Sequence, residues 1–249
     1  MMKLLRIITK AVKDPKKAFR KAGRILFKRP VAGYCSVCGE QGILYKYGHP
    51  RISYFCKYCG AVARNRHMAI ILCRVLDLGE PFSLRQLTAT RPDLKVYQAQ
   101  ARGPIHDALA SLPGYVCSEF RPDTPPGAIS ASGARHEDLQ QLSFPADHFD
   151  VVITEDVMEH IRDTDAAWRE ILRVLKPGGY HVFTIPYDPA RKTERRIRIE
   201  GGEDIAVLPK VYHDDGMRDS LVYTDFGSDL LEHLNQLGLI SQLHGIEGL

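Results

Sequence analysis

Long apolar runs are absent from this sequence: no stretch of eighteen consecutive apolar residues occurs, which predicts no membrane-spanning helix. Aromatic residues are few, at 8 %, with a single Trp. Acidic residues are nearly absent from residues 1–30, where Asp14 is the one acid among 11 Lys and Arg. No apolar core of signal-peptide length follows the first lysine. These absences favour a cytoplasmic protein with a strongly basic amino-terminal arm.

The length and charge of the chain predict a large body with small additions. A chain of 249 residues can bury one sizeable α/β core and leave room for a small module. Its hydrophobic fraction of 44 % and charged fraction of 26 % are ordinary for globular proteins. Residues 1–30 have a net charge of +10, whereas the rest, with 23 basic and 29 acidic residues, has −6. This asymmetry indicates an anionic partner for the arm.

Residues 1–30 are predicted to form a basic amphipathic arm. Apolar residues recur there at helical spacing between basic clusters, and Asp14-Pro15 should divide the arm into two short helices. Such helices can lie on an anionic membrane surface, making the protein peripheral to the membrane. Three alternatives stay open: an arm whose apolar stripe packs on the body, a transit peptide, and nucleic-acid binding. The last is disfavoured because aromatic residues for base stacking are few.

Residues 31–62 are predicted to form a zinc ribbon. Two C-x-x-C-G knuckles supply four thiolates, and each glycine permits the tight turn that a knuckle needs. The alternative of two disulfides requires an oxidising compartment. A β-hairpin is expected between the knuckles, around Gly48-His49-Pro50. The predicted ligands of a structural Zn²⁺ are Cys35, Cys38, Cys56 and Cys59, which leave no open position for water.

A helix and linker are expected over residues 63–92, before the main domain at residues 93–249. The helix carries Arg64 and Arg66 on its polar side, where they could dock the ribbon, remain solvated or contact a phosphate. Cys73 and Cys117 stand outside the knuckle pattern and read as small buried apolar residues.

A strand–helix–strand unit spans residues 137–186. Residues 149–154 form a short apolar run rich in β-branched residues, which is typical of a buried parallel strand. A helix with Thr164 or Asp165 as N-cap should follow and stop at Lys176-Pro177-Gly178-Gly179, and residues 180–185 read as the next strand. A right-handed crossover is expected, in a sheet that helices cover on both faces.

This unit resembles the class I S-adenosylmethionine-dependent methyltransferases. FDVVITEDVMEHI followed by EILRVLKPGG carries the resemblance, with Asp138 and Leu139 ahead of a Leu-Ser-Phe turn. It implies a Rossmann-like, doubly wound α/β sheet that binds S-adenosylmethionine. Asp138 and Leu139 would then hold the adenine, and Glu119, at the end of a strand over residues 115–120, would accept hydrogen bonds from the ribose hydroxyls. Gln98, Gly103 and Thr154, at or near other strand ends, complete the predicted cofactor set.

The sequence departs from the family pattern in three places. After the strand at residues 94–98, the usual glycine-rich turn is reduced to Gly103. Residues 121–134 are rich in Pro, Gly and Ser and predict a loop where a helix is usual. A helix over 226–237 and a strand over 239–243 are expected near the end, without the final antiparallel strand of the family.

Methyl transfer is an in-line displacement, so it needs a base only when the acceptor is protonated. His160 and His213 are the candidate bases, and either Glu155 or Asp156 could orient the acceptor. For His160, a purely structural role, with its ring satisfied by the backbone or by Glu159, stays open. A basic cluster over residues 191–198 could bind an anionic substrate or be a solvated face.

The acceptor is predicted to be a small molecule, with a saccharide or glycan precursor as one candidate. The layout, including Tyr212-His213-Asp214-Asp215-Gly216, is similar to that of zinc-ribbon methyltransferases found with glycosyl-transfer genes. The alternative function is a non-catalytic methyltransferase-like scaffold that binds a partner or membrane through the ribbon and the arm. The reduced glycine turn favours that alternative.

Overall fold

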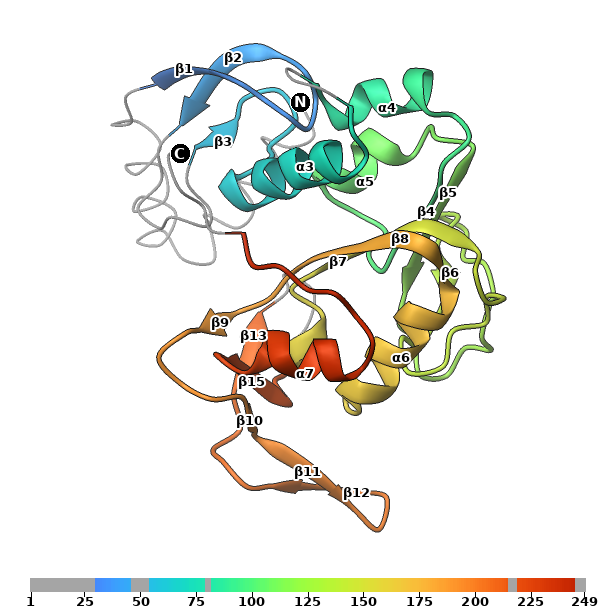
Figure 1. Ribbon diagram of the computed structural model, residues 1–249, viewed down its shortest axis with the longest axis vertical. Helices are drawn as coiled ribbons and strands as arrows, with labels where there is room; N and C mark the ends of the chain where they lie inside the picture. The colour runs from blue at the N-terminus through green and yellow to red at the C-terminus, as the bar shows by residue number, and fades with distance from the viewer. Residues whose placement is uncertain (1–29, 46–53, 79–81, 215–218, 245–249) are drawn as a thin grey trace, which may run out of the picture.

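A five-stranded parallel sheet lies at the centre of the chain in the computed structural model (Figure 1). Its strands, in spatial order, are β6 (Arg135–His136), β5 (Gly114–Glu119), β4 (Lys95–Gln98), β7 (Phe149–Glu155) and β8 (Leu175–Thr184). The chain runs from β4 outward to β6 and then returns to the other side of β4. Ligands of open α/β sheets bind outside the carboxyl ends of the strands at such a reversal.

The structure describes residues 30–45, 54–78, 82–214 and 219–244. The predicted arm, apart from residue 30, and the turn of the ribbon hairpin lie outside these ranges. In the described part of the chain, no helix is both long and apolar enough to cross a membrane.

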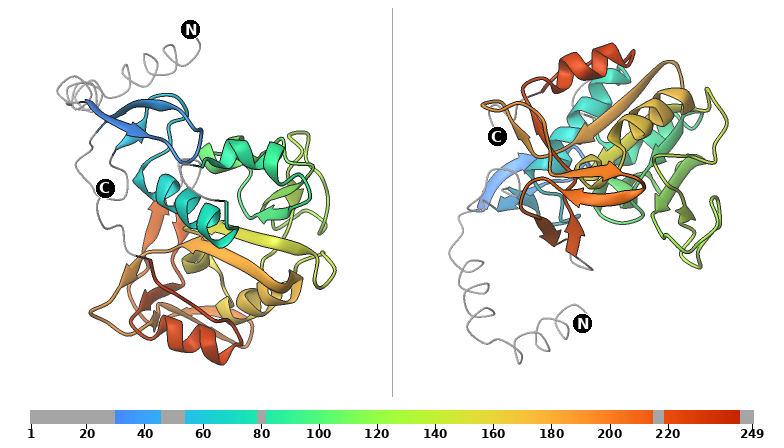
Figure 2. Two further views of the ribbon diagram at one scale, coloured as in Figure 1. Left: turned by 45° about the horizontal axis from the view of Figure 1, so that its top comes forward. Right: turned by 90° about the horizontal axis from the view of Figure 1, so that it is seen from below.

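Helices cover both faces of the sheet, as the resemblance implies. α3 (Ala63–Val75), α4 (Leu84–Thr90) and α5 (Pro104–Leu109) pack on one face, and α6 (Thr164–Val174) and α7 (Leu230–Gln236) on the other (Figures 1 and 2). Strand β7 shows why two cores form. Val151 and Ile153 join the core beneath α3, whereas Val152 joins the core beneath α6, because successive side chains of a strand point to opposite faces.

Helix α6 begins one residue before the expected region. Its N-cap is Asp163, whose carboxylate accepts a hydrogen bond from the backbone N–H of Ala166 at 3.1 Å. The prediction of Thr164 or Asp165 was therefore wrong, because the side chain that meets the free N–H groups decides the cap. The end of the helix was placed correctly, since Leu175 is extended. The start of the next strand was wrong, because β8 begins at Leu175 and not at residue 180.

Three antiparallel strands, β1 (Pro30–Tyr34), β2 (Gln41–Tyr45) and β3 (Phe55–Cys56), carry the cysteine knuckles. Val37, in the turn between β1 and β2, and Ala61, between β3 and α3, are fully buried in the same core as α3. The ribbon is therefore part of the packing on that face of the central sheet.

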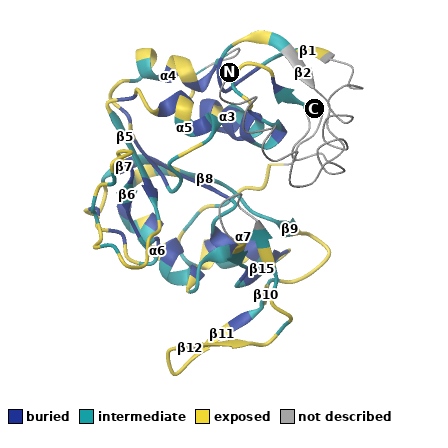
Figure 3. Ribbon diagram, turned by 180° about the vertical axis from the view of Figure 1, so that it is seen from behind, coloured by how far each residue is buried: buried dark blue, intermediate teal, exposed yellow. Residues whose placement is uncertain are grey.

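The segment after β8 contains more strands than the sequence predicted. β9 (Tyr187–Asp188) and β10 (Glu194–Arg195) flank β15 (Thr224–Gly227), while β11 (Ile197–Glu200) with β12 (Glu203–Ala206) and β13 (Tyr212–Asp214) with β14 (Asp219–Leu221) form two hairpins. Figure 3 shows that the β11–β12 hairpin is largely exposed. Ile197 and Ile199 alternate with polar residues before Gly201-Gly202, a hairpin pattern that the sequence analysis missed.

Two expectations near the end were wrong. The final helix begins at Leu230 and not at 226, because Phe226 belongs to β15. Residues 239–243 form no strand; Ile240 there is 101 % exposed and has no sheet to join. The loop prediction for residues 121–134 is confirmed, since no helix occurs there. Among the described residues, no antiparallel strand closes the central sheet.

Candidate functional site

The carboxyl ends of three neighbouring strands bring predicted site residues to one edge of the sheet. Gln98 ends β4, Glu119 ends β5 and Glu155 ends β7. Parallel pairing places Gln98 opposite both Cys117 and Ile153, so the three ends lie at nearly the same height.

Glu155 is held by amide groups at this edge. Its Oε2 accepts from Asn65 Nδ2 at 2.6 Å and its Oε1 from Gln98 Nε2 at 3.1 Å, and the residue is 8 % exposed. Burial raises the pKa of Glu155, opposed by nearby Arg64 and by these hydrogen bonds. Both oxygens are thus engaged inside the protein, which favours a structural role over the predicted contact with an acceptor.

The same network continues away from Glu155 through the end of β4. Gln98 Oε1 accepts from the Tyr115 hydroxyl at 2.8 Å, and that hydroxyl lies 2.8 Å from His106 Nδ1. Burial raises the pKa of Tyr115, so the hydroxyl keeps its proton. Gln98 is fully buried, so its side chain joins Glu155 to Tyr115 and does not reach outward.

Helix α3 supplies partners that the sequence analysis did not assign to the site. Asn65 and Arg64 stand in its first turn, where Arg64 forms an ion pair with Asp156 directly after β7. Asp156 has φ of 51°, a left-handed conformation that is uncommon for a non-glycine residue and is often found at functional sites. The partners are about ninety positions apart in the chain, so no local pattern could reveal the pairing.

The predicted adenine and ribose residues lie on adjacent segments. Strands β5 and β6 pair so that Glu119 is opposite His136, two positions before Asp138. Both carboxylates are partly exposed; Glu119 pairs with Arg121 at 3.0 Å, and Asp138 accepts from the backbone N–H of Gln140 at 2.9 Å. Leu139 is 5 % exposed and belongs to the core beneath α6.

Glu137 anchors this segment, which the sequence analysis missed. It is 2 % exposed, pairs with Arg135 at 3.0 Å and accepts from the backbone N–H and the hydroxyl of Ser143 at 2.9 and 2.6 Å. The loop before β7 is therefore closed by a buried carboxylate, which leaves the neighbouring Asp138 pointing toward the surface.

Gly103 is at the start of α5 with φ of 99°, a conformation that a residue with a Cβ adopts only with strain. Thr154 does not join the other predicted cofactor residues. It is fully buried, and its hydroxyl lies 3.0 Å from Nε2 of His181 on β8. The side chain of Thr154 thus lies inside the protein, away from the open edge.

The two predicted bases meet beside the end of β7. His160 lies on the short helix η2 (Met158–His160) and His213 on β13, with ring centroids 5.1 Å apart. Between them is Glu159, which is 1 % exposed. The two histidines are far apart in the sequence, and the fold of the segment after β8 brings their rings together.

The four predicted metal ligands form one cluster, with all sulfurs within 4.8 Å of one another. The pairs Cys35–Cys59 and Cys38–Cys56 each have a sulfur–sulfur distance of 3.7 Å, far longer than a disulfide bond. A tetrahedron of about 2.3 Å Zn–S bonds has edges of about 3.7–3.8 Å. The donor set and its spacing thus fit Zn²⁺.

The knuckle geometry and a buried cation agree with this fit. Gly39 and Gly60 have φ of 82° and 76°, as the glycine prediction required. Arg66 is 4 % exposed, its Nε and Nη2 have no hydrogen-bond partner among the described residues, and it lies near Cys35, Cys56 and Cys59. Four thiolates around Zn²⁺ carry a net charge of −2, which an adjacent guanidinium would offset.

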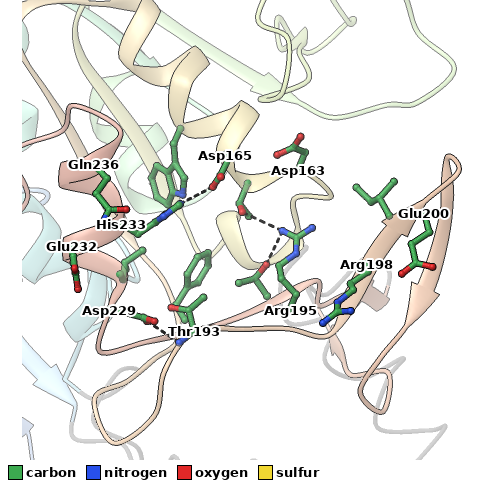
Figure 4. Close-up of a pocket in the computed structure, with 16 residues that line it drawn as sticks. Asp163, Asp165, Thr193, Arg195, Arg198, Glu200, Asp229, Glu232, His233 and Gln236 are labelled. Carbon is green, nitrogen blue, oxygen red and sulfur yellow. Dashed lines mark hydrogen bonds and ion pairs between the residues drawn. The ribbon is translucent and has the colours of Figure 1, made fainter.

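A separate pocket of about 770 Å³ lies between α6, α7 and the β11 region (Figure 4). Arg195 and Arg198 from the basic cluster line it, and Arg195 is held by Thr164, Thr224 and the carbonyl of Arg162. None of the predicted cofactor residues or bases lines this pocket. Asp163, which lines the pocket, donates its backbone N–H to the side chain of Gln140 at 2.9 Å. Gln140 in turn donates a hydrogen bond to Asp138, one of the predicted cofactor residues.

The basic cluster is divided in the structure. Arg196 pairs with Asp225 at 2.7 Å, and Arg191 is an exposed residue near Asp188. Only part of the cluster is therefore oriented toward a pocket.

Comparisons with known proteins agree with this geometry. Residues 117–183 match the family model described as a methyltransferase domain. Sterol 24-C-methyltransferase erg6 of Aspergillus fumigatus is 26 % identical over 187 residues, covering 68 % of this chain and 47 % of that protein. Arsenite methyltransferase of Aquipseudomonas alcaligenes is 29 % identical, covering 75 % of this chain and 48 % of that protein. The chain spans about half the length of these relatives.

Among solved structures, an S-adenosylmethionine-dependent methyltransferase from Mesorhizobium loti is similar at 17 % identity, with a TM-score of 0.36 over 62 % of this chain and 80 % of that one. The region matched by the family model runs from β5 through most of β8 and so includes the ends that carry Glu119 and Glu155. The match of residues 117–183 to a methyltransferase domain supports the resemblance to the class I S-adenosylmethionine-dependent methyltransferases.

Proposed function

We propose that this protein transfers a methyl group from S-adenosylmethionine to a small polar acceptor. The observation that carries the proposal is the convergence of Glu119 and the Asp138 segment at the open end of a sheet whose strands match the methyltransferase domain. S-adenosylmethionine supplies a methyl group on a sulfonium, which a lone pair of the acceptor displaces. The residues of the chain hold the two molecules in line and exclude water.

The residues at the edge fit the cofactor chemically. Glu119 is a partly exposed carboxylate at a strand end, suited to accept two ribose hydroxyls. Asp138 and Leu139 present a carboxylate beside an apolar side chain, suited to an adenine ring. The backbone at Gly103, with its positive φ, leaves the turn after β4 open to the amino-acid part of the cofactor.

A saccharide or glycan precursor is our proposed acceptor class. The pocket in Figure 4 supports it, because Arg195, Thr193 and several carboxylates line it. Apolar residues, among them Phe226, line it as well. Hydrogen-bonding groups around an apolar surface suit a hydroxyl-rich molecule. Hydrogen bonds that run from Asp163, which lines the pocket, through Gln140 to Asp138 support this assignment.

We further propose that Cys35, Cys38, Cys56 and Cys59 bind one structural Zn²⁺. The two 3.7 Å sulfur–sulfur distances and the buried Arg66 support this assignment. All four ligands are thiols, so no position remains for a reacting water.

The alternative is a scaffold without catalysis, which the reduced glycine turn favours. Calorimetry with S-adenosylmethionine and S-adenosylhomocysteine separates the two functions. The enzyme binds both compounds, whereas a scaffold binds neither. The absence of any heat of binding with millimolar S-adenosylhomocysteine would contradict the proposed function.

A further inference from the structure

A second cluster of metal-binding side chains, separate from the four cysteines, lies beside the end of β7. A carboxylate oxygen of Glu159 and one ring nitrogen each of His160 and His213 all lie within 4.8 Å of one another. Glu159 and His160 follow β7 directly on η2, and β13 brings His213 to them. Two imidazoles and one carboxylate form a donor set that borderline divalent ions prefer.

A backbone contact orients the ring of His160. Its Nδ1 lies 2.8 Å from the carbonyl oxygen of Leu221, which can only accept, so Nδ1 carries the proton. In the neutral ring, Nε2 then carries the lone pair, on the side of Glu159. A hydrogen bond from the other ring nitrogen to a carbonyl is the usual support of a metal-bound histidine.

The distances within the cluster exceed those of direct hydrogen bonds. His160 Nε2 is 3.7 Å and His213 Nδ1 is 3.8 Å from the same oxygen, Oε1 of Glu159. Hydrogen bonds between such groups are about 2.7–3.2 Å long. Ligands on a shared ion, each about 2.1 Å from it, are about 3.4 Å apart in a tetrahedron. The observed spacing is within a few tenths of an ångström of that edge.

The solvent exposure of the three side chains increases from Glu159 through His160 to His213. The side chain of Glu159 is 1 % exposed, that of His160 18 % and that of His213 43 %. An ion held here would be enclosed on the Glu159 side and accessible on the His213 side. Closed sites stabilise structure, whereas three ligands with an open position are typical of metals that bind a reacting molecule.

We propose that Glu159, His160 and His213 bind a divalent transition-metal ion with open coordination positions. The two histidines are then metal ligands and not free bases. The role of the ion rests on the proposed methyl transfer: the ion would lower the pKa of an acceptor hydroxyl bound at its open position, which puts the reacting hydroxyl outside the pocket lined by Arg195. The hydroxyl proton passes to solvent water, the O–CH₃ bond forms, and the C–S bond breaks to leave a neutral thioether.

The test uses full-length protein with its cysteine site loaded with Zn²⁺. Mn²⁺ is titrated in and the loss of the free-ion electron paramagnetic resonance signal is recorded. We expect one bound Mn²⁺ per chain. Co²⁺ added to the same protein should give the weak visible bands of nitrogen and oxygen ligands, without the charge-transfer bands of thiolates.

His213→Ala removes one ligand, and its partial exposure makes it a mild change for folding. We expect Mn²⁺ affinity to fall at least about tenfold, because replacing residues that only hydrogen-bond to metal ligands already lowers affinity by about that factor. His233→Ala is the matched control, since the side chain of His233 is also 43 % exposed but lies on α7, paired with Asp165. It should leave Mn²⁺ affinity unchanged.

Glu159→Gln keeps the shape of the side chain and removes its charge, and it should also abolish binding in protein that melts cooperatively. The proposal is overturned if wild-type protein binds neither ion at millimolar concentration. It is equally overturned if His213→Ala and Glu159→Gln bind Mn²⁺ as wild type does. These titrations contain no methyl donor, so their outcome is independent of the calorimetry that tests methyl transfer.

Discussion

At the scale of single residues, the carboxylates at the sheet edge divide into internal and outward groups. Glu137 and Glu155 are buried and saturated with hydrogen bonds, whereas Glu119 and Asp138 keep exposed surface. The buried pair holds the frame of the edge, and the outward pair is available to a ligand. Identical residue types thus differ in role because of their neighbours.

Replacing Glu119 or Asp138 by Ala should weaken S-adenosylhomocysteine binding. Loss of a charged acceptor costs about 1.5–3 kcal/mol, or about ten- to a hundredfold in affinity. Melting temperature without ligand should barely change, because both side chains are partly exposed and surface ion pairs contribute little. Calorimetry measures the first effect and thermal unfolding the second. Asp123→Ala, an exposed carboxylate in the loop after β5, is the control; equal binding by all three variants would refute the assignment.

His181 should make the protein less stable in acid. Burial among Trp168 and Phe183 lowers its pKa to about 3. An unfolded histidine gains its proton near pH 6.5. The unfolded chain therefore binds one more proton between these values, and this residue lowers the unfolding free energy as pH falls from 6.5 to 3. The slope is at most about 1.4 kcal/mol per pH unit.

Denaturant titrations of wild type and His181→Gln at several pH values check this. Gln can still hydrogen-bond the hydroxyl of Thr154 but does not titrate. The variant should show a shallower loss of stability below pH 6.5; the same slope in both proteins would show that His181 is not the group responsible.

At the scale of elements, α3 joins the ribbon to the edge of the sheet. It starts after the second knuckle, and its first turn contacts both Glu155 and Asp156. The hydroxyl of Ser36, from the first knuckle, donates to the carbonyl of Arg66 at 2.7 Å. A change in the ribbon should therefore reach the end of β7 through α3.

Purified protein should contain one equivalent of zinc, and Cys59→Ser should lose it. Cys117→Ser, which changes a cysteine of similar intermediate exposure outside the cluster, should retain it. Because binding energy at such sites is folding energy, chelation should lower the melting temperature and speed hydrogen exchange in α3. Metal analysis and exchange mass spectrometry measure these effects. Metal-free protein that stays fully folded would contradict the assignment.

At the scale of the whole molecule, the arm over residues 1–30 and the rest of the chain have net charges of opposite sign. We propose that residues 1–30, with their net charge of +10, bind anionic lipid surfaces and hold the protein at the cytoplasmic face of a membrane. The body, at −6, would be repelled by the same surface and remain in solution.

Sedimentation with vesicles that contain phosphatidylserine should capture full-length protein, and the captured fraction should fall as salt rises, because salt screens the attraction. Protein lacking residues 1–30 should stay in the supernatant. Vesicles of neutral lipid are the control. Equal sedimentation of both forms with anionic vesicles would exclude the arm as the binding segment.

The central fold and the clustering of the four knuckle cysteines could be predicted from sequence because their signals are local. The apolar run at residues 149–154, the helical pattern of α6 and the stop at Lys176-Pro177-Gly178-Gly179 each fit within one element. The knuckle prediction likewise needed only the spacing of Cys35, Cys38, Cys56 and Cys59 with their glycines. Each pattern reports on backbone geometry or donor type, which adjacent residues determine.

What only the tertiary structure decided was which side chains meet. Asn65 reaches Glu155, and His213 reaches His160, across long stretches of chain whose folding depends on packing. Thr154 lies within the protein because its hydroxyl meets His181 on the neighbouring strand. The β11–β12 hairpin did have a local signal, because Ile197 and Ile199 alternate with polar residues before Gly201-Gly202, and the sequence analysis missed it. A local pattern therefore determined the elements here, whereas burial and long-range pairing determined which of their residues can act.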